Sequence, residues 1–136
     1  MNISLRAGEK LYINGAVFRV DRKVSIELLN DVTFLLEAHV MQANEATTPL
    51  KQIYFVVQIV LMDPGSASAA LELSRKLIDA ALRTFEDREI LSGLKAVDEM
   101  VVCARYFDAM KALRALFPQE RGAMTGNPKA PAPHAA

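Results

Sequence analysis

The chain of 136 residues has the length of one ordinary domain. Half of its residues are apolar (51%) and 24% are charged, which favours a folded chain and excludes global disorder. The 16 Lys and Arg residues balance 16 Asp and Glu residues, and this zero net charge excludes a protein that holds nucleic acid by bulk basicity.

The balanced total hides a segregation of charge along the chain. Residues 1–23 contain five bases and two acids, a net charge of +3, whereas residues 24–63 contain one base and five acids, a net charge of −4. Such an asymmetry indicates a local site for a charged partner. Alternatively, the extra positive charges are ordinary solvated side chains.

Residues 1–45 predict a small antiparallel β-rich module. Asn14-Gly15 is the strongest turn signal in the sequence, because both central positions of a type I′ turn need a positive φ. The alternation of apolar and polar residues predicts half-buried strands with turns between them. These strands are expected at 3–5, 10–13, 16–20, 24–28 and 32–36, with His39 near the end of the last one.

Residues 46–117 predict an α-helical module of about three to four helices, so the expected fold class is α+β. Thr48 and Pro49 predict the first helix start, because Thr caps free amides and Pro fits the first helical position. The apolar spacing predicts helices over 50–62, 67–86, 88–104 and 106–117.

The last part of the chain, residues 118–136, predicts a disordered Pro/Ala-rich tail. Pro128, Pro131 and Pro133 stand among Ala and Gly and leave no periodic apolar face. We therefore expect the fold not to need this segment.

Cysteine use and hydropathy bear on the compartment. The single cysteine, Cys103, lies in a helical pattern and is expected to be a buried structural thiol. The start Met-Asn-Ile-Ser lacks the pattern of a signal peptide, and one cysteine forms no internal disulfide, so we expect a cytoplasmic protein. The most apolar stretch, 53–62, is shorter than the about 20 residues of a spanning helix, so no membrane association is expected.

Residues suited to catalysis or metal binding are sparse. His39 and His134 are the two histidines, and the glycines form no phosphate-binding motif. The acid pairs Glu86-Asp87 and Asp98-Glu99 have bases nearby in predicted helices, which is typical of a solvated helix face. The sequence therefore predicts no catalytic residue, no metal site and no cofactor, and hence a protein that is not an enzyme.

The bases of the first 23 residues, together with one aromatic neighbour, form the strongest candidate site. Basic groups supply phosphate contacts, and a tyrosine can stack on an unpaired base. By alternation, Lys10 and Tyr12 share one face of their strand. Alternatively, Tyr12 packs in the core and the bases are solvated. The candidate RNA-binding residues are Arg6, Lys10, Tyr12, Arg19, Arg22 and Lys23.

Four specific strings stand in the first 55 residues: LRAGEKLYINGAV at 5–17, VDRKV at 20–24, LNDVTFLLE at 29–37 and ATTPLKQIYF at 46–55. Together they closely resemble the FlbT family of flagellum-biosynthesis regulators. The resemblance implies a cytoplasmic post-transcriptional regulator that binds the 5′ untranslated region of flagellin mRNA. Such a protein would promote decay of the message or alter its translation, with FlaF and flagellin as further partners.

A different class of function stays open beside this one. The apolar helical face and the acidic 24–63 segment are also consistent with a protein-interaction module. Such a module would bind FlaF, flagellin or a flagellar export component, and its effect on RNA would be indirect.

A second, weaker likeness concerns the first strands. Arg6-x-Gly8-Glu9-x-Leu11-x-Ile13 is similar to the opening of CsrA, a small β-rich dimer that binds messenger leaders. In that family the arginine of the first strand meets an arginine from the last strand of the partner chain. Arg6 matches the first of these, but residues 33–41 contain no arginine. The likeness implies a homo-oligomer, in particular a dimer.

Overall fold

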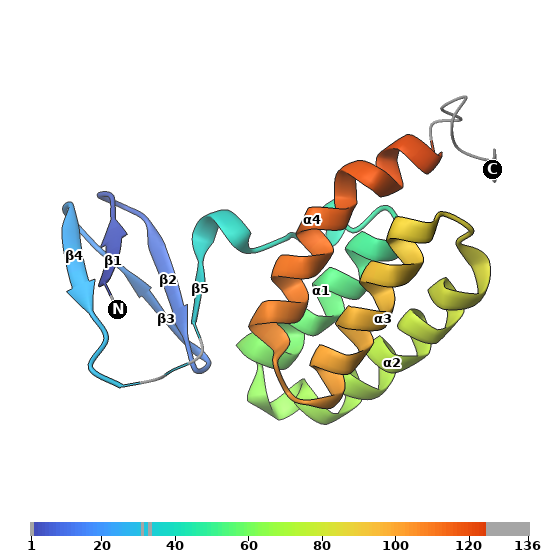
Figure 1. Ribbon diagram of the computed structural model, residues 1–136. Helices are drawn as coiled ribbons and strands as arrows, with labels where there is room; N and C mark the ends of the chain where they lie inside the picture. The colour runs from blue at the N-terminus through green and yellow to red at the C-terminus, as the bar shows by residue number, and fades with distance from the viewer. Residues whose placement is uncertain (1, 31, 33, 125–136) are drawn as a thin grey trace.

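The computed structural model describes residues 2–30, 32 and 34–124, and it places a β-rich module beside a helical bundle (Figure 1). The described strands are β1 (Asn2–Leu5), β2 (Lys10–Ile13), β3 (Ala16–Arg19), β4 (Val24–Glu27) and β5 (Phe34–Leu36). The described α-helices are α1 (Pro49–Met62), α2 (Ala67–Thr84), α3 (Arg88–Val102) and α4 (Tyr106–Met124). Three 3-10 helices complete the order: η1 (Glu37–His39), η2 (Ala43–Glu45) and η3 (Pro64–Ser66). The predicted α+β class is confirmed.

The first four strands form one long hairpin that is bent in the middle. β1 pairs with β4 and β2 pairs with β3, both antiparallel, and Asn2 lies opposite Glu27 while Lys10 lies opposite Arg19. The two ladders therefore share one register, because Lys10 lies eight residues after Asn2 and Arg19 lies eight residues before Glu27. The predicted Asn14-Gly15 turn is confirmed, with φ values of 48° and 85°.

The three-stranded sheet, in the order β3-β2-β5, separates two apolar clusters. Leu11 on one face packs with Ile3 and Leu5 of β1 in a small core within the β-rich module. On the opposite face, Tyr12 and Leu35 pack against the large core of the helices. The sheet is thus the layer that joins the two modules.

The helical module begins at the predicted signal. The Thr48 side chain accepts a hydrogen bond from the Lys51 amide at 3.2 Å, and Pro49 opens α1. Leu50, Ile53 and Val57 of α1 are fully buried in the core that α1 shares with α2, α3 and α4. Burial on most sides of α1 explains its nearly continuous apolar sequence.

The predicted start of the tail at Pro118 is wrong. Pro118 lies inside α4, which continues to Met124. A proline in a helix interior costs about 3 kcal/mol, so other contacts must hold this last part of the helix. Leu116, Phe117 and Ala123 pack against the helical core, and Glu120 is buried. The remainder of the predicted tail, 125–136, lies outside the described residues.

Two predictions about single residues are also wrong. Cys103 is exposed, because α3 ends at Val102 and Cys103 lies in the exposed turn that leads to α4. His39 lies in η1 rather than in a strand, since β5 ends at Leu36.

The predicted half-burial of the 16–20 strand is wrong for β3. All four residues of β3 are exposed, because β3 is the outer strand of its sheet and neither apolar cluster extends over it.

Within the described ranges, no single helix is both long and apolar enough to cross a membrane. α1 and the segment Pro64–Thr84 pass that test only as a pair, and the pair is bent by 117°.

Candidate nucleic-acid interface

The bend of the long hairpin gathers the five bases that the sequence singled out. Both ladders are interrupted at 6–9 on one side and at 20–23 on the other. The two sides stay connected there, because Gly8 donates its amide to the Val20 carbonyl at 2.7 Å. We call the bases at and beside this bend the basic corner; they are Arg6, Lys10, Arg19, Arg22 and Lys23.

Lys10 and Arg19 are direct cross-strand partners at the inner border of the bend. Opposite residues of an antiparallel pair project from the same face of the sheet, so these two cations share one face. Lys10 is half-buried and Arg19 is exposed. Like charges directly opposite each other destabilise a sheet, and an anion such as a phosphate would relieve that repulsion.

The carboxylates near the basic corner are largely engaged with backbone amides. Glu9 accepts from the Arg6 amide at 2.9 Å, and Glu37 accepts from the Lys10 amide at 2.7 Å. Asp21 pairs with Arg22 at 3.3 Å, but both side chains are about four-fifths exposed, so this pair adds little.

The Glu9 and Glu37 carboxylates keep their negative charge when they accept from amides, but in the described part of the chain they form no ion pair with the cations of the corner. Within residues 2–30, 32 and 34–124, the side chains of Arg6, Lys10, Arg19 and Lys23 make no ion pair.

Tyr12 is not brought into the corner as an open stacking surface. It lies opposite Val17 and Leu35, and its ring packs against the helical core. The alternative that the sequence left open for this residue, packing in the core, describes what the structure has.

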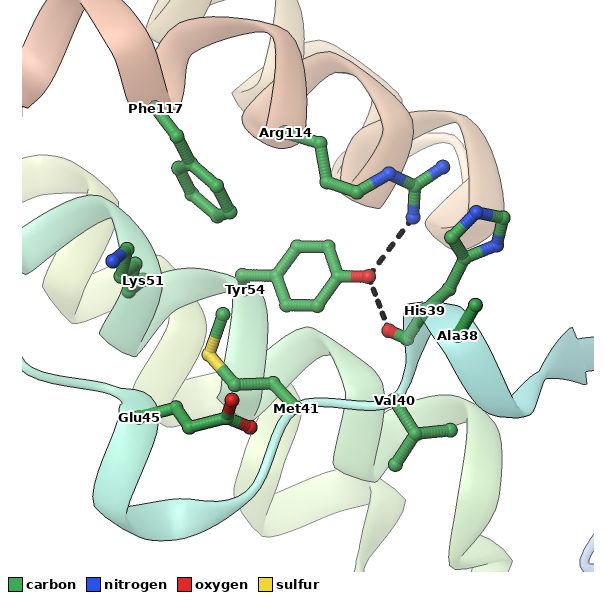
Figure 2. Close-up of a pocket in the computed structure, with 9 residues that line it drawn as sticks. All are labelled: Ala38, His39, Val40, Met41, Glu45, Lys51, Tyr54, Arg114 and Phe117. Atoms are coloured by element: carbon green, nitrogen blue, oxygen red, sulfur yellow. Dashed lines mark hydrogen bonds between the residues drawn. The ribbon is translucent and has the colours of Figure 1, made fainter.

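A second polar site lies where the linker after β5 crosses the helices (Figure 2). The Tyr54 hydroxyl accepts from Arg114 at 2.9 Å and donates to the His39 carbonyl. Burial, and then the nearby Arg114 charge, lower the pKa of His39. The pocket of about 230 Å³ is lined by Ala38, His39, Val40, Met41, Glu45, Lys51, Tyr54, Arg114 and Phe117.

This second site fastens the linker to α1 and α4. Gln58 strengthens the attachment, because its side chain accepts from the Met41 amide at 2.7 Å and donates to the Met41 carbonyl at 2.9 Å. Sequence reasoning missed the site. The available signal was the presence of Tyr54 and Gln58 in an apolar helix, since buried polar groups need hydrogen-bond partners.

Comparison with known proteins identifies the family of this chain. Residues 1–124 match the family described as "Flagellar protein FlbT". The chain belongs to the FlbT family.

Three relatives within the FlbT family carry the name "probable flagellum biosynthesis repressor protein". The protein of Mesorhizobium japonicum is 53% identical and aligns over 98% of this chain and 92% of its own length. FlbT 2 of Bradyrhizobium diazoefficiens is 55% identical, with 93% of each chain covered. The protein of Allorhizobium ampelinum is 51% identical, with 97% and 89% covered. No solved structure matches the chain.

The FlbT match includes both modules. It extends through the end of α4 at Met124, seven residues beyond the predicted end of the helical module at 117. The helix beyond Pro118 is thus part of the family's domain and not an added extension.

Proposed function

We propose that this protein is a non-catalytic regulator of flagellum biosynthesis that binds the 5′ untranslated region of flagellin mRNA through the basic corner. The names of the FlbT relatives support the role in flagellum biosynthesis. The observation that supports RNA contact is the cross-strand pair of Lys10 and Arg19, two cations held on one face without an ion pair in the described part of the chain.

The proposed binding is local and electrostatic. Phosphate contacts position a protein on nucleic acid, and exposed Arg and Lys side chains supply them. The acidic 24–63 segment repels RNA from much of the neighbouring surface, so the message is held at the corner alone. Decay or altered translation then follows from changed access of nucleases or ribosomes to the leader.

A charge-matched pair of variants tests this assignment. Lys10→Ala combined with Arg19→Ala should weaken binding to a flagellin leader RNA at least tenfold, because two phosphate contacts are lost. Arg88→Ala combined with Lys95→Ala removes the same charge from exposed positions of α3 and should leave the affinity within about twofold. Equal effects of the two variants, measured by titration of labelled RNA, would contradict a site at the corner.

The second candidate function, a protein-interaction module, is favoured by an apolar groove between α1 and α2. The groove has a volume of about 440 Å³, and Phe55, Ile59, Met62 and Leu73 are among its lining residues. Leu73 is 47% exposed there. If the protein freed of nucleic acid binds purified flagellin or FlaF tightly, loses this binding on Leu73→Lys and binds no leader RNA, this second function is the correct one.

A further inference from the structure

The outer edge of β3 is an apolar strand edge that no described element covers. β3 pairs with β2 on one side, and it is the last strand of its sheet. Val17 is 61% exposed and Phe18 is 50% exposed. Natural sheets guard exposed edges with charges, prolines or bulges, because an open edge pairs with other strands. Of the four residues of β3, only Arg19 has this guarding character.

The backbone groups on this edge are fixed by the ladder to β2. Val20 donates its amide to the Glu9 carbonyl at 3.2 Å, which makes residues 20, 18 and 16 the ones that bond inward. Inward and outward groups alternate along an antiparallel strand. The N–H and C=O groups of Val17 and Arg19 therefore point away from the sheet.

We propose that this edge pairs with the same edge of a second copy of the chain, antiparallel and two-fold symmetric, with Phe18 opposite Phe18 of the second copy. In that register Val17 of each copy lies opposite Arg19 of the other. All outward groups of Val17 and Arg19 then exchange hydrogen bonds, four bonds in total. A strand of this length is thus complementary to itself.

Competing symmetric registers are poorer. A shift that places Arg19 opposite Arg19 sets two like charges directly against each other, which destabilises a sheet. The opposite shift places Val17 opposite Val17 and Arg19 opposite Gly15 of the turn, so only the two hydrogen bonds of the central pair remain in the strand. The charges and the hydrogen bonds therefore favour the same register, with Phe18 opposite Phe18. Because the edge is complementary to itself in this register, a second copy of the chain is the partner that fits it.

The layers of the protomer leave room for this pairing. Phe18 lies on the face of the small core and Val17 on the face of the helical core, and neither is covered. The product is a six-stranded sheet in which Lys10, Arg19 and Val17 of both copies all lie on one face. Two basic corners thereby join into one surface. The pairing itself does not rest on RNA binding.

Cysteine cross-linking of the full chain tests the register. In a background with Cys103→Ser, Phe18→Cys should form a disulfide-linked dimer under mild oxidation, because non-hydrogen-bonded partners have Cα atoms about 4.5 Å apart. Val17→Cys is the matched control; its counterpart in the second copy is two residues out of register, so it should cross-link at least tenfold more slowly. Equal rates for the two variants, or no cross-linking at Phe18→Cys, would overturn the proposal.

A charge exchange gives a second test that does not depend on oxidation. Phe18→Lys and Phe18→Glu should each be monomeric in sedimentation at concentrations where the natural chain is dimeric, and an equal mixture of the two should recover the dimer. Val102→Lys, at a similarly exposed position at the end of α3, should remain dimeric. A monomeric natural chain, or a dimer that both single variants retain, contradicts the pairing whether or not the protein binds RNA.

Discussion

At the residue scale, Glu120 is the side chain whose role departs most from its sequence context. It is 1% exposed and accepts hydrogen bonds from the Thr48 hydroxyl and, at 2.8 Å, from the Leu50 amide. A residue of α4 thus satisfies the first turn of α1, where free amides and the helix dipole favour a carboxylate. Burial raises the pKa of Glu120, while the hydrogen bonds from Thr48 and Leu50 and the charge of Lys51 lower it.

Removal of this carboxylate should destabilise the fold. Glu120→Ala leaves the buried Leu50 amide and the half-buried Thr48 hydroxyl without their partner, and we expect a loss of about 2–4 kcal/mol in the free energy of unfolding. Glu99→Ala, at an exposed position of α3, should change it by less than about 0.5 kcal/mol. Chemical denaturation of both variants measures the difference, and equal midpoints would refute the role given to Glu120.

The raised pKa of Glu120 also predicts a pH dependence. The Glu120 carboxyl group binds its proton more tightly in the folded chain than in the unfolded chain, where its pKa has the ordinary value of 4.5. Protonation of Glu120 therefore stabilises the fold most below pH 4.5. Stability from this group should fall as the pH rises through the folded pKa. The free energy of unfolding of the natural chain relative to Glu120→Gln should therefore decrease from pH 4 to pH 7, and an increase would show the opposite shift.

At the scale of elements, the features that depend on local sequence could be predicted, whereas the features that depend on tertiary contacts could not. Asn14-Gly15 and Thr48-Pro49 carry their signals within two residues, and the hairpin and α1 begin where those signals stand. Pro118 was misjudged because the bonds that hold α4 come from residues 70 and more positions away. The exposure of Phe18 likewise depends on which strand is outermost, and alternation alone does not give that order.

The candidate site could likewise be predicted only where it depends on local sequence. The five bases could be found from their density in the first 23 residues, and their gathering follows from the turn at Asn14-Gly15 and the shared register. The packing of Tyr12 and the polar site around Tyr54 depend on the helical module, so local spacing did not assign them.

The tip of the hairpin offers a test of how the two modules are joined. Gly15 has a φ of 85°, and an added Cβ would lie 3.2 Å from Pro64 Cδ of η3; Gly8 has a φ of 82° and open space around it. Both Gly→Ala changes should cost about 1–2 kcal/mol through backbone strain, and Gly15→Ala should cost more, because Pro64 must also shift. Thermal unfolding of the two variants gives the comparison, and a larger loss for Gly8→Ala would contradict this contact.

At the scale of the whole molecule, a chain with no net charge holds one compact group of cations. The helical bundle carries the large core, and the bent hairpin places Arg6, Lys10, Arg19, Arg22 and Lys23 at its corner. The rest of the chain has 11 bases against 16 acids, and this negative net charge limits non-specific binding, so a small number of phosphate contacts can act on a defined leader. Binding of RNA at the corner is therefore electrostatic and rests on few phosphate contacts.

The salt dependence of binding to a flagellin leader RNA tests this central claim most directly. Each phosphate contact with single-stranded RNA contributes about −0.7 to the slope of log K against log salt concentration. Engagement of all five bases therefore predicts a slope of about −3.5. Lys10→Ala with Arg19→Ala should reduce the slope by about 1.4, whereas Arg88→Ala with Lys95→Ala should leave it unchanged. An affinity that stays flat with salt, or a slope that neither pair of substitutions alters, would contradict RNA binding at the basic corner.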